Sequence, residues 1–388
     1  MTKEKTREFL CGAGLTSIPL VRLDELSSRS ATIWLKKEWI HPDGPDPLRS
    51  IKRKPACFLL GDAFEKRYLE GDKILVSATS GNLGIEIGLL AMHESLPFHA
   101  VVPSAIPDYN LRILTALGID VIRTEEQETC PRKFTVFFAS GYAHEFRHRL
   151  VNVDQYSSWL NPLSHSLTTA KEIFEMSDIG VNHIVASVGS CGTISGIRHY
   201  LMISGLECST TGVQPAARHA VPGTQIIKGD CGWSPENYAP AILPGDSIET
   251  ADSVDTYAFT AKLWAMGIPA GPSTGMALSR AWRMARNGAI GNIVVISPDS
   301  SFKYHDLIAE RLEMLGGEIT QRYPALDLDR AIDSYLGHLA GVWGLARMLA
   351  RVRECYTPLR EGRTFGVRDI EDIVLGRTAS THTMPCVP

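Results

Sequence analysis

Between residues 73 and 124 the chain alternates between short apolar runs and longer segments with helical spacing. The apolar runs are 73–78, 98–103 and 120–124, and the helical segments are 84–93 and 109–118. Short apolar runs bounded by turn residues are typical of buried strands, and their alternation with helices of about ten residues is typical of βαβ units. Since parallel strands need such crossovers, this region predicts a parallel sheet flanked by helices.

The same alternation recurs later in the chain. Segments 165–176 and 276–288 have helical spacing, 182–188 and 292–297 read as strands, and a glycine-rich turn at 189–193 enters a helix. A chain of 388 residues is long enough for two domains. We therefore predict an α/β fold of two domains, each with a mostly parallel twisted sheet, and a ligand site beyond the carboxyl ends of the strands.

The last seventy or so residues have a different pattern. Residues 327–354 carry apolar side chains at helical spacing, among them Ile332, Leu336, Leu339 and Trp343. We expect residues 319–388 to form a helical C-terminal extension that serves in packing or dimerisation, with a polar and loosely held end.

Composition excludes several classes of protein. The net charge of −4 is mild and no basic stripe occurs, which argues against a nucleic-acid partner. No apolar run of about 18 residues suggests a membrane helix, and the polar start does not resemble a signal peptide, so we expect a cytoplasmic protein. The eight cysteines include no CxxC pair, so neither a metal site nor a disulfide framework is expected.

Four short motifs carry the functional prediction: SIKRKPA at 50–56, TSGNLG at 79–84, GSCGT at 189–193 and GPSTG at 271–275. Each glycine turn is weak evidence alone, because strand-to-helix turns are commonly rich in glycine. Together, and in this order, they resemble the signatures of the fold-type II pyridoxal-phosphate enzymes, specifically the cysteine synthase and cystathionine β-synthase family. The resemblance covers about residues 15–310 and implies the tryptophan synthase β-like fold.

This resemblance assigns the residues that would hold the cofactor, pyridoxal 5′-phosphate. Lys52 matches the family's Schiff-base lysine, which can react only when its amine is partly neutral. The turn of Gly189, Ser190, Cys191, Gly192 and Thr193 matches the phosphate-binding turn, where glycine permits a tight concave backbone. Ser273 matches the serine at the pyridine nitrogen. A neutral hydroxyl there makes a weaker electron sink than a carboxylate, which favours β-elimination and β-replacement over transamination.

The resemblance also assigns substrate contacts. Thr79, Ser80, Gly81 and Asn82 match the loop that binds the α-carboxylate of an amino acid, and backbone amides at a helix start suit such an anion. Asn82 also matches the residue that binds the cofactor's ring hydroxyl. Gln155 matches a glutamine that helps to hold the carboxylate.

The implied domains are a large cofactor-binding domain at 1–46 and 166–318 and a small, mobile domain at 47–165 that contains Lys52. The chain departs from the family at Arg53-Lys54, where Asp-Arg is usual, at Leu83, where threonine is usual, and at Cys191, which replaces a glycine. We expect the side chain of Cys191 to be tolerated on the condition that its φ is negative.

The predicted reaction is β-replacement on O-acetyl- or O-phospho-L-serine through an α-aminoacrylate. A sulfur or amine nucleophile would give cysteine or a related β-substituted alanine, and a homodimer acting on a small-molecule amino acid is expected. Asn110-Leu111 stands where cysteine synthases more often have a lysine, which favours a 2,3-diaminopropionate-type synthase of a secondary-metabolite pathway as the alternative. A serine or threonine dehydratase and a catalytically inactive paralogue are weaker alternatives.

Overall fold

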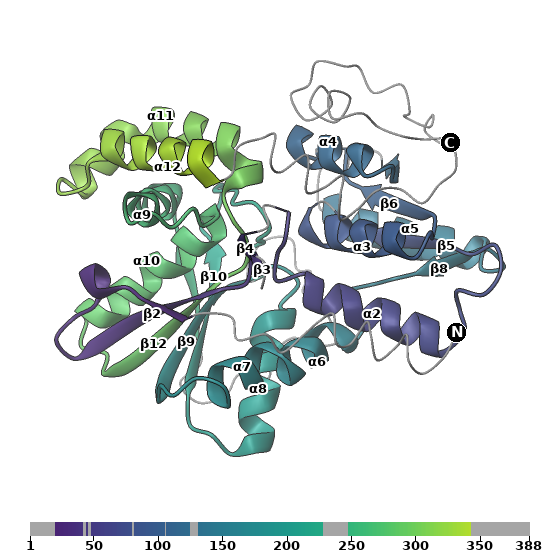
Figure 1. Cartoon of the computed structure of the whole chain (residues 1–388), viewed down its shortest axis with the longest axis horizontal. Helices are drawn as coiled ribbons and strands as arrows, with labels where there is room; N and C mark the ends of the chain where they lie inside the picture. The colour runs from purple at the N-terminus through teal and green to yellow at the C-terminus, as the bar shows by residue number, and fades with distance from the viewer. Residues whose placement is uncertain are drawn as a thin grey trace. The chain divides into compact units, whose positions relative to one another are not determined.

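The computed structural model describes residues 20–41, 44–45, 48–79, 81–104, 106–124, 131–227 and 247–342. Contacts within the chain divide it into two compact units, which Figure 1 shows with their helices and strands labelled. In the described residues, the first unit is 52–158 and the second consists of 20–51 and 159–342. The first unit lies within the predicted small domain, whose mobility stays a prediction. Most of the predicted C-terminal extension, from residue 343, and Ser80 lie outside the described residues.

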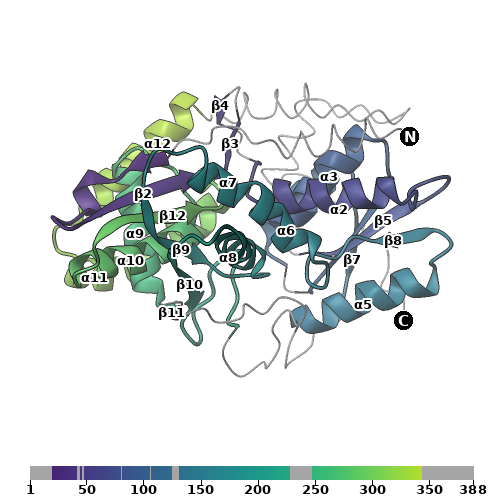
Figure 2. The same cartoon turned by 90° about the horizontal axis from the view of Figure 1, so that it is seen from below.

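The first unit is a four-stranded sheet in the order β7-β6-β5-β8, with all neighbours parallel. Its strands are β5 (Ile74–Ala78), β6 (Phe98–Val102), β7 (Asp120–Arg123) and β8 (Leu150–Asn152). Its helices are α2 (Arg53–Glu65), α3 (Asn82–His93), α4 (Asp108–Ala116) and α5 (Pro131–Glu145). Figure 2 shows α5 on one side of this sheet and α2 with α3 on the other.

The central strand β5 is buried along nearly its whole length, as a parallel strand covered on both faces must be. Val76 and Ala78 point to one face, where they pack with Ala139 and Ala143 of α5. Side chains alternate between the faces of a strand, so Leu75 points to the other face, and it is fully buried. This two-sided burial explains the uninterrupted apolar run in the sequence.

The second unit is a six-stranded sheet in the order β1-β2-β12-β9-β10-β11. All neighbours are parallel except β1, which pairs antiparallel with β2. Its strands are β1 (Leu20–Arg22), β2 (Ala31–Lys37), β9 (Val181–Ser187), β10 (Ser209–Pro215), β11 (Ser247–Ala251) and β12 (Gly291–Ser297). The short strands β3 (Ile40–His41) and β4 (Gly44–Pro45) form a separate pair, and η1 (Asp24–Leu26) and η2 (Phe302–Tyr304) are single 3₁₀ turns.

Helices cover both faces of this second sheet (Figure 1). One face carries α6 (Leu160–Leu167), α7 (Thr169–Phe174) and α8 (Gly192–Ser204). The opposite face carries α9 (Ser253–Ala265) and α10 (Pro272–Arg286), with α11 (His305–Arg322) and α12 (Leu328–Val342) packed on α9. The predicted α/β class, with two mostly parallel sheets flanked by helices, is therefore confirmed. No helix in the described part of the chain is long and apolar enough to cross a membrane.

Two details of the helices differ from the sequence prediction. The segment predicted as one helix at 165–176 is two helices that meet at Thr168, whose φ of −124° and ψ of −75° are not helical. Among the α12 side chains that the structure describes, up to Leu336, Ala331 and Tyr335 are buried, whereas Leu336 is 54% exposed. Tyr335 stacks on Trp264 of α9 with ring centroids 3.7 Å apart, so an aromatic contact determines which face of α12 is buried.

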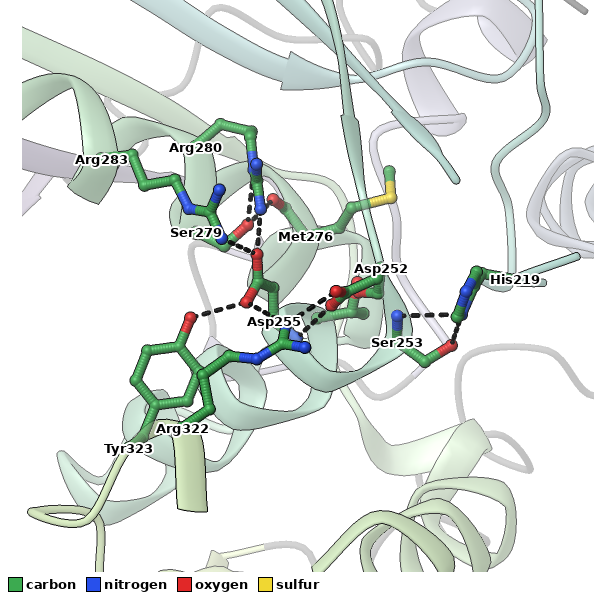
Figure 3. A network of polar contacts seen from close by, with 11 residues as sticks. His219, Asp252, Ser253, Asp255, Met276, Ser279, Arg280, Arg283, Arg322 and Tyr323 are labelled. Atoms are coloured by element: carbon green, nitrogen blue, oxygen red, sulfur yellow. Dashed lines mark hydrogen bonds and ion pairs between the residues drawn. The ribbon is translucent and has the colours of Figure 1, made fainter. Parts of the chain in front are cut away.

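A polar network joins α9, α10 and the end of α11 (Figure 3). At its centre the buried carboxylate of Asp255 accepts hydrogen bonds from Arg280, Arg283 (2.6 Å), Arg322 (3.0 Å) and the hydroxyl of Tyr323 (2.7 Å). Burial and the bond to Asp255 raise the pKa of Tyr323 to about 12. One carboxylate thus links three helices.

Replacing Asp255 with Asn should lower the free energy of unfolding by about 3 kcal/mol, because it leaves the buried guanidinium of Arg280 without its counter-charge. The partial exposure of Arg283 and Arg322 keeps the loss at the lower end of the range for buried pairs. Urea unfolding followed by circular dichroism would measure it. Asp252→Asn is the control: Asn retains the N-cap that Asp252 provides to Asp255 N at 2.8 Å, so the loss should stay below about 1 kcal/mol. Equal losses would contradict the central role of Asp255.

Asp252 should also make stability depend on acidic pH. Burial alone would raise the pKa of Asp252, but the Asp255 amide and Arg322 outweigh burial and lower it below the ordinary value of 3.8. The stability that Asp252 contributes is therefore complete above the unfolded-state pKa and is lost as the pH falls through the lower folded-state pKa. Urea titrations between neutral and strongly acidic pH should show a shallower acid decline in Asp252→Asn than in the parent. An unchanged decline would contradict this contribution.

Candidate active site

In the first unit the structure brings Lys52 and Gln155 together. Lys52 is the residue immediately before α2, and its Nζ donates a hydrogen bond of 3.1 Å to Gln155 Oε1. Gln155 is 5% exposed, although it lies in a loop. Two residues that are 103 positions apart and were both predicted as site residues therefore share one contact.

The position of Gln155 is fixed by its neighbours. Asp154 accepts hydrogen bonds from the Tyr156 amide at 2.7 Å and from the Ser157 hydroxyl at 2.5 Å, which forms a tight turn around Gln155. Val153 is tied to β5 by a backbone bond to Val76 and by the Ser77 hydroxyl, each 2.7 Å long. Gln155 is thereby held just beyond the carboxyl end of β8.

The turn of Thr79, Gly81 and Asn82 follows β5, which pairs in parallel with β8. The carboxyl ends of adjacent parallel strands lie at the same edge of a sheet, so this turn and Gln155 share that edge. Thr79 Oγ1 accepts the Gly84 amide at 2.9 Å, in the first turn of α3. Because its oxygen already accepts from the protein, the O–H of Thr79 is available as a donor for an anion.

Two further residues of this region were singled out in the sequence. Leu83, which stands in place of the family's threonine, is 2% exposed and belongs to the buried side of α3. Asn110 is 5% exposed, and its Nδ2 lies 3.3 Å from the position that a Cβ on Gly81 would take. Asn110 thus packs directly against the predicted carboxylate loop.

In the second unit the turn from Gly189 to Thr193 joins β9 to α8. Gly189 lies so close to the carbonyl of Gly223 that a Cβ would be 2.5 Å from its oxygen, and a Cβ on Gly192 would be 2.0 Å from Asn161 Oδ1. Neither position can carry a side chain without movement of the structure. The amides of the first turn of α8 have no carbonyl partner within the helix, so they are donors for an anion.

Cys191 corrects one expectation. Its φ is +63°, in the left-handed region, and not negative as its tolerance was predicted to require. Cys191 precedes α8, and its left-handed conformation directs successive backbone amides toward one point. Such a backbone forms a concavity of the kind that binds anions. The side chain is 4% exposed and packs in the apolar cluster with Ile194 and Ile197. Burial of the thiol offsets part of the backbone strain that glycine would avoid.

Ser273 lies in the first turn of α10. Pro272 occupies the first position of this helix, where its missing N–H costs nothing. Gly275 packs so tightly on α9 that a Cβ on it would be 2.2 Å from Thr260 Oγ1. The start of α10 is tied to the residues after β12, since Gly271 N donates to Asp299 O at 3.0 Å. Ser273 therefore lies, like the turn after β9, at the carboxyl edge of the second sheet.

A buried hydrogen-bond chain fixes the residue next to Ser273. Trp39 Nε1 donates to Ser297 Oγ at 3.0 Å, and Ser297 Oγ is also 3.0 Å from Thr274 Oγ1. Thr274 and Ser297 are fully buried. The chain connects Trp39, which follows β2, with β12 and α10, so the backbone that carries Ser273 is held from behind.

A buried ion triad stabilises the helices beside the turn. Lys36 Nζ of β2 lies 2.8 Å from Glu38 and 2.5 Å from Glu172 of α7. Burial alone would lower the pKa of Lys36, but the two carboxylates outweigh it and raise the pKa. The triad joins the sheet to α7, which follows α6 directly.

The sequence reasoning missed Asn161 and His165 of α6, which contact the turn. Asn161 Nδ2 donates to Ser190 Oγ at 3.0 Å, and His165 Nε2 lies 3.4 Å from Thr193 Oγ1. A sequence signal was present: Gly192 and Gly196 are four apart in α8, and such spacing permits close approach of a second helix.

The family described as "Pyridoxal-phosphate dependent enzyme" matches residues 13–299. The chain belongs to this family. The enzyme is 28% identical over 303 residues to a cysteine synthase of Aquifex aeolicus (strain VF5), covering 74% of this chain and 87% of that protein.

Solved structures show the same fold. The crystal structure of O-ureido-L-serine synthase matches 76% of the enzyme and 92% of that chain, with a TM-score of 0.64 and 23% identity. The O-acetylserine dependent cystathionine beta-synthase from Helicobacter pylori matches 77% and 96%, with a TM-score of 0.66 and 21% identity. The enzyme thus belongs to the pyridoxal-phosphate dependent enzymes, has the fold-type II architecture and is similar in sequence to cysteine synthases.

The described residues fit this cofactor. Its phosphate requires several donors in a small concave space, and the turn at 189–193 offers helix-start amides, two hydroxyls and glycines at the positions that a Cβ would block. A lysine with a buried amide partner is present at Lys52. The turn supplies hydrogen-bond donors of the kind that a phosphate needs, and Lys52 supplies an amine of the kind that reacts with an aldehyde.

The backbone at residue 191 gives a stability test. Cys191→Val should lower the free energy of unfolding by about 2 kcal/mol, because a β-branched side chain is strongly disfavoured at positive φ. Cys191→Gly should stay within about 1 kcal/mol of the parent, since relief of strain offsets the lost burial. Urea unfolding would measure both, with Cys208→Val as a control at a half-buried position outside the left-handed region. A Cys191→Val protein as stable as the parent would contradict the left-handed assignment.

Proposed function

We propose that this enzyme catalyses β-replacement on O-acetyl- or O-phospho-L-serine and adds a sulfur or amine nucleophile, which gives cysteine or a related β-substituted alanine. The observation that carries the proposal is the contact between Lys52 Nζ and Gln155 Oε1 beside the turn that follows β5. It places an amine next to groups suited to an amino acid's carboxylate. The names of the relatives reported above describe enzymes of this class of chemistry, which supports the proposal.

In this proposal the donors of the first unit bind the substrate. The Thr79 hydroxyl, the amides that begin α3 and the Gln155 side chain would hold the α-carboxylate, which is the group common to all amino-acid donors. Ser80 belongs to the same loop by its place in the sequence. Asn82, the first residue of α3, would bind the cofactor's ring hydroxyl.

Lys52 would hold the cofactor and then move a proton. When bound, the cofactor supplies an electron sink that lets the Cα–H bond break. The Lys52 amine takes that proton as a general base, and acetate or phosphate leaves Cβ with its bonding electron pair. The nucleophile then forms a bond to Cβ, and Lys52 returns the proton to Cα. The hydrogen bond from Lys52 to Gln155 supports this role, because Gln155 is one of the groups proposed to bind the carboxylate.

Ser273 selects among reactions of the cofactor. A serine hydroxyl at the start of α10 offers the pyridine nitrogen a neutral partner, which favours departure of a group from Cβ over transamination. The turn at 189–193 would hold the phosphate. Asn110 packs against Gly81, and this neutral residue at a position where lysine is more common favours 2,3-diaminopropionate-type synthesis as the second candidate.

The donor can be identified by mixing the purified enzyme separately with O-acetyl-L-serine and O-phospho-L-serine and measuring released acetate or phosphate. Release from one donor identifies the leaving group, and sulfide, homocysteine and amines can then be compared as nucleophiles by the product formed. Formation of 2-oxobutyrate from L-threonine as the main reaction would contradict the proposal and indicate a dehydratase. Protein without bound cofactor, even after its addition, would indicate an inactive paralogue.

Lys52→Ala should reduce release of the leaving group by about 10²–10⁴-fold, since it removes the proposed general base. It should also abolish covalent attachment of the cofactor, which borohydride reduction followed by mass spectrometry would detect. Lys66→Ala, at the other end of α2, is the matched control and should retain both properties. Covalent attachment that persists in Lys52→Ala would show that another lysine holds the cofactor.

A further inference from the structure

We propose that His219 is a positioning residue for the cofactor's phosphate. Its imidazole anchors the loop that follows β10 to the start of α9, and the far end of the same loop holds the turn at 189–193 in its shape. This role depends on the proposed function of the turn as the phosphate site. His219 lies outside the four sequence motifs.

Three adjacent strands of the second sheet bring these parts together. β9, β10 and β11 pair in parallel, with β10 in the middle, so the segments that follow them leave the same edge of the sheet. The turn at 189–193 follows β9, and the start of α9 follows β11. The loop at 216–225 follows the middle strand and contacts both neighbours.

The far end of the loop packs against the residues that enter the turn. Gly223 has a φ of +76°, and a Cβ on Gly189 would lie 2.5 Å from the Gly223 carbonyl oxygen. The Gln225 amide donates to Val188 O at 3.0 Å, and Gln225 Nε2 donates to Gly189 O. Because the packing is so close, a displacement of the loop end displaces the start of the turn.

His219 fastens the loop at its other side (Figure 3). The Ser253 amide donates to His219 Nδ1 at 3.2 Å, and Ser253 Oγ lies 2.9 Å from the same nitrogen. A backbone amide can only donate, so Nδ1 is the acceptor of this bond and the proton of the neutral ring is on Nε2. Ser253 is the first residue of α9, where the amide has no carbonyl partner within the helix. His219 therefore caps α9 from a separate loop.

The start of α9 is a firm anchor. Asp252 accepts the Asp255 amide at 2.8 Å and pairs with Arg322 at 2.7 Å, which fixes this helix end to the end of α11. Asp255 adds the bond to Arg322 at 3.0 Å and the bond from Tyr323 at 2.7 Å. The imidazole thus ties the loop to an interlocked group of helices.

The backbone beside His219 is strained. Arg218 has a φ of +66°, in the left-handed region that residues with a side chain rarely adopt. The His219 amide closes a turn over it by donating to Ala216 O at 3.0 Å. Such strain persists only where surrounding contacts hold it, and it is concentrated at functional sites. The bond from Ser253 is one of the contacts that hold it, so loss of the imidazole should let the loop relax.

A relaxed loop should weaken phosphate binding. A turn that samples more conformations loses more entropy when a ligand orders it, and only a ligand with a phosphate makes that demand. The effect should therefore appear in the affinity for pyridoxal 5′-phosphate and not in the affinity for pyridoxal. Coupling between two sites is reciprocal, so pyridoxal 5′-phosphate should also slow hydrogen exchange in peptides that cover residues 216–227.

The test measures the affinities of the full-length apoenzyme for pyridoxal 5′-phosphate and for pyridoxal by equilibrium titration. His219→Ala should lower the ratio of the two affinities about threefold to tenfold, which corresponds to one neutral hydrogen bond. His219→Asn should stay within about twofold of the parental ratio, because Asn Oδ1 takes the place of Nδ1 and accepts from the Ser253 amide. Rescue by asparagine distinguishes positioning from the loss of side-chain volume.

His183 provides the matched control. Its Nδ1 lies 2.5 Å from Ser209 Oγ, near the amino ends of β9 and β10 and so at the opposite edge of the same sheet. His183→Ala removes a histidine–serine contact of the same kind and should keep both the parental affinity ratio and the slower exchange of residues 216–227 with pyridoxal 5′-phosphate.

Thr193→Val reports separately on the proposed function and should lower the ratio at least about tenfold, as expected for a lost hydrogen bond to a charged group. A parental ratio in Thr193→Val would overturn the proposed role of the turn. A lowered ratio there with a parental ratio in His219→Ala would overturn the positioning role of His219 alone. So would equal losses for both probes in His219→Ala, an equal loss in His219→Asn and His219→Ala, or unchanged exchange of the loop in the parent.

Discussion

The close approach of α6 to α8 is the contact on which the second unit's functional end depends. It exists because Gly192 and Gly196 have no side chains where Asn161, Pro162 and His165 lie. Any larger residue at either glycine would separate the helices, and the polar side chains of α6 would lose the hydroxyls that they contact. The ion triad of Lys36, Glu38 and Glu172 then fixes α7, and with it the end of α6, to the sheet.

The two units present their functional residues in the same way. In each, a loop leaves the carboxyl end of a parallel strand and leads into a helix N-terminus, at α3 in the first unit and at α8 in the second. The start of α10, which follows α9, is tied to the residues after β12 at the same edge of the second sheet. Helix starts supply amide donors without charged side chains, which suits carboxylates and phosphates. The sheet edge determines where these amide donors lie, and the loops determine which ligand atoms the amides can bind.

Much of this could be predicted from the sequence, because the deciding signals were local. The buried run at 73–78 identified β5, and the motif order identified the family, while the roles of Lys52, Gln155 and Ser273 stay predictions. Asn161 and His165 were missed because the glycine spacing in α8 indicates a close helix contact without identifying which residues of the other helix make it. The φ of Cys191 was also missed, since residue type alone does not reveal that this position must be left-handed to form the anion-binding turn. In α12 the stacking of Tyr335 on Trp264 decided a face that hydrophobic spacing assigned differently.

If the turn at 189–193 binds the cofactor's phosphate, as proposed, the hydrogen bonds behind the turn have a consequence for the energetics of cofactor binding. Because Asn161 and Gln225 already fix the turn through bonds within the protein, its shape does not depend on the ligand to order it. Little conformational entropy then has to be lost when phosphate enters, so a larger share of the interaction energy appears as affinity. The conformational entropy of the turn is lost when the protein folds, so the proposed phosphate site is preorganised before the cofactor binds.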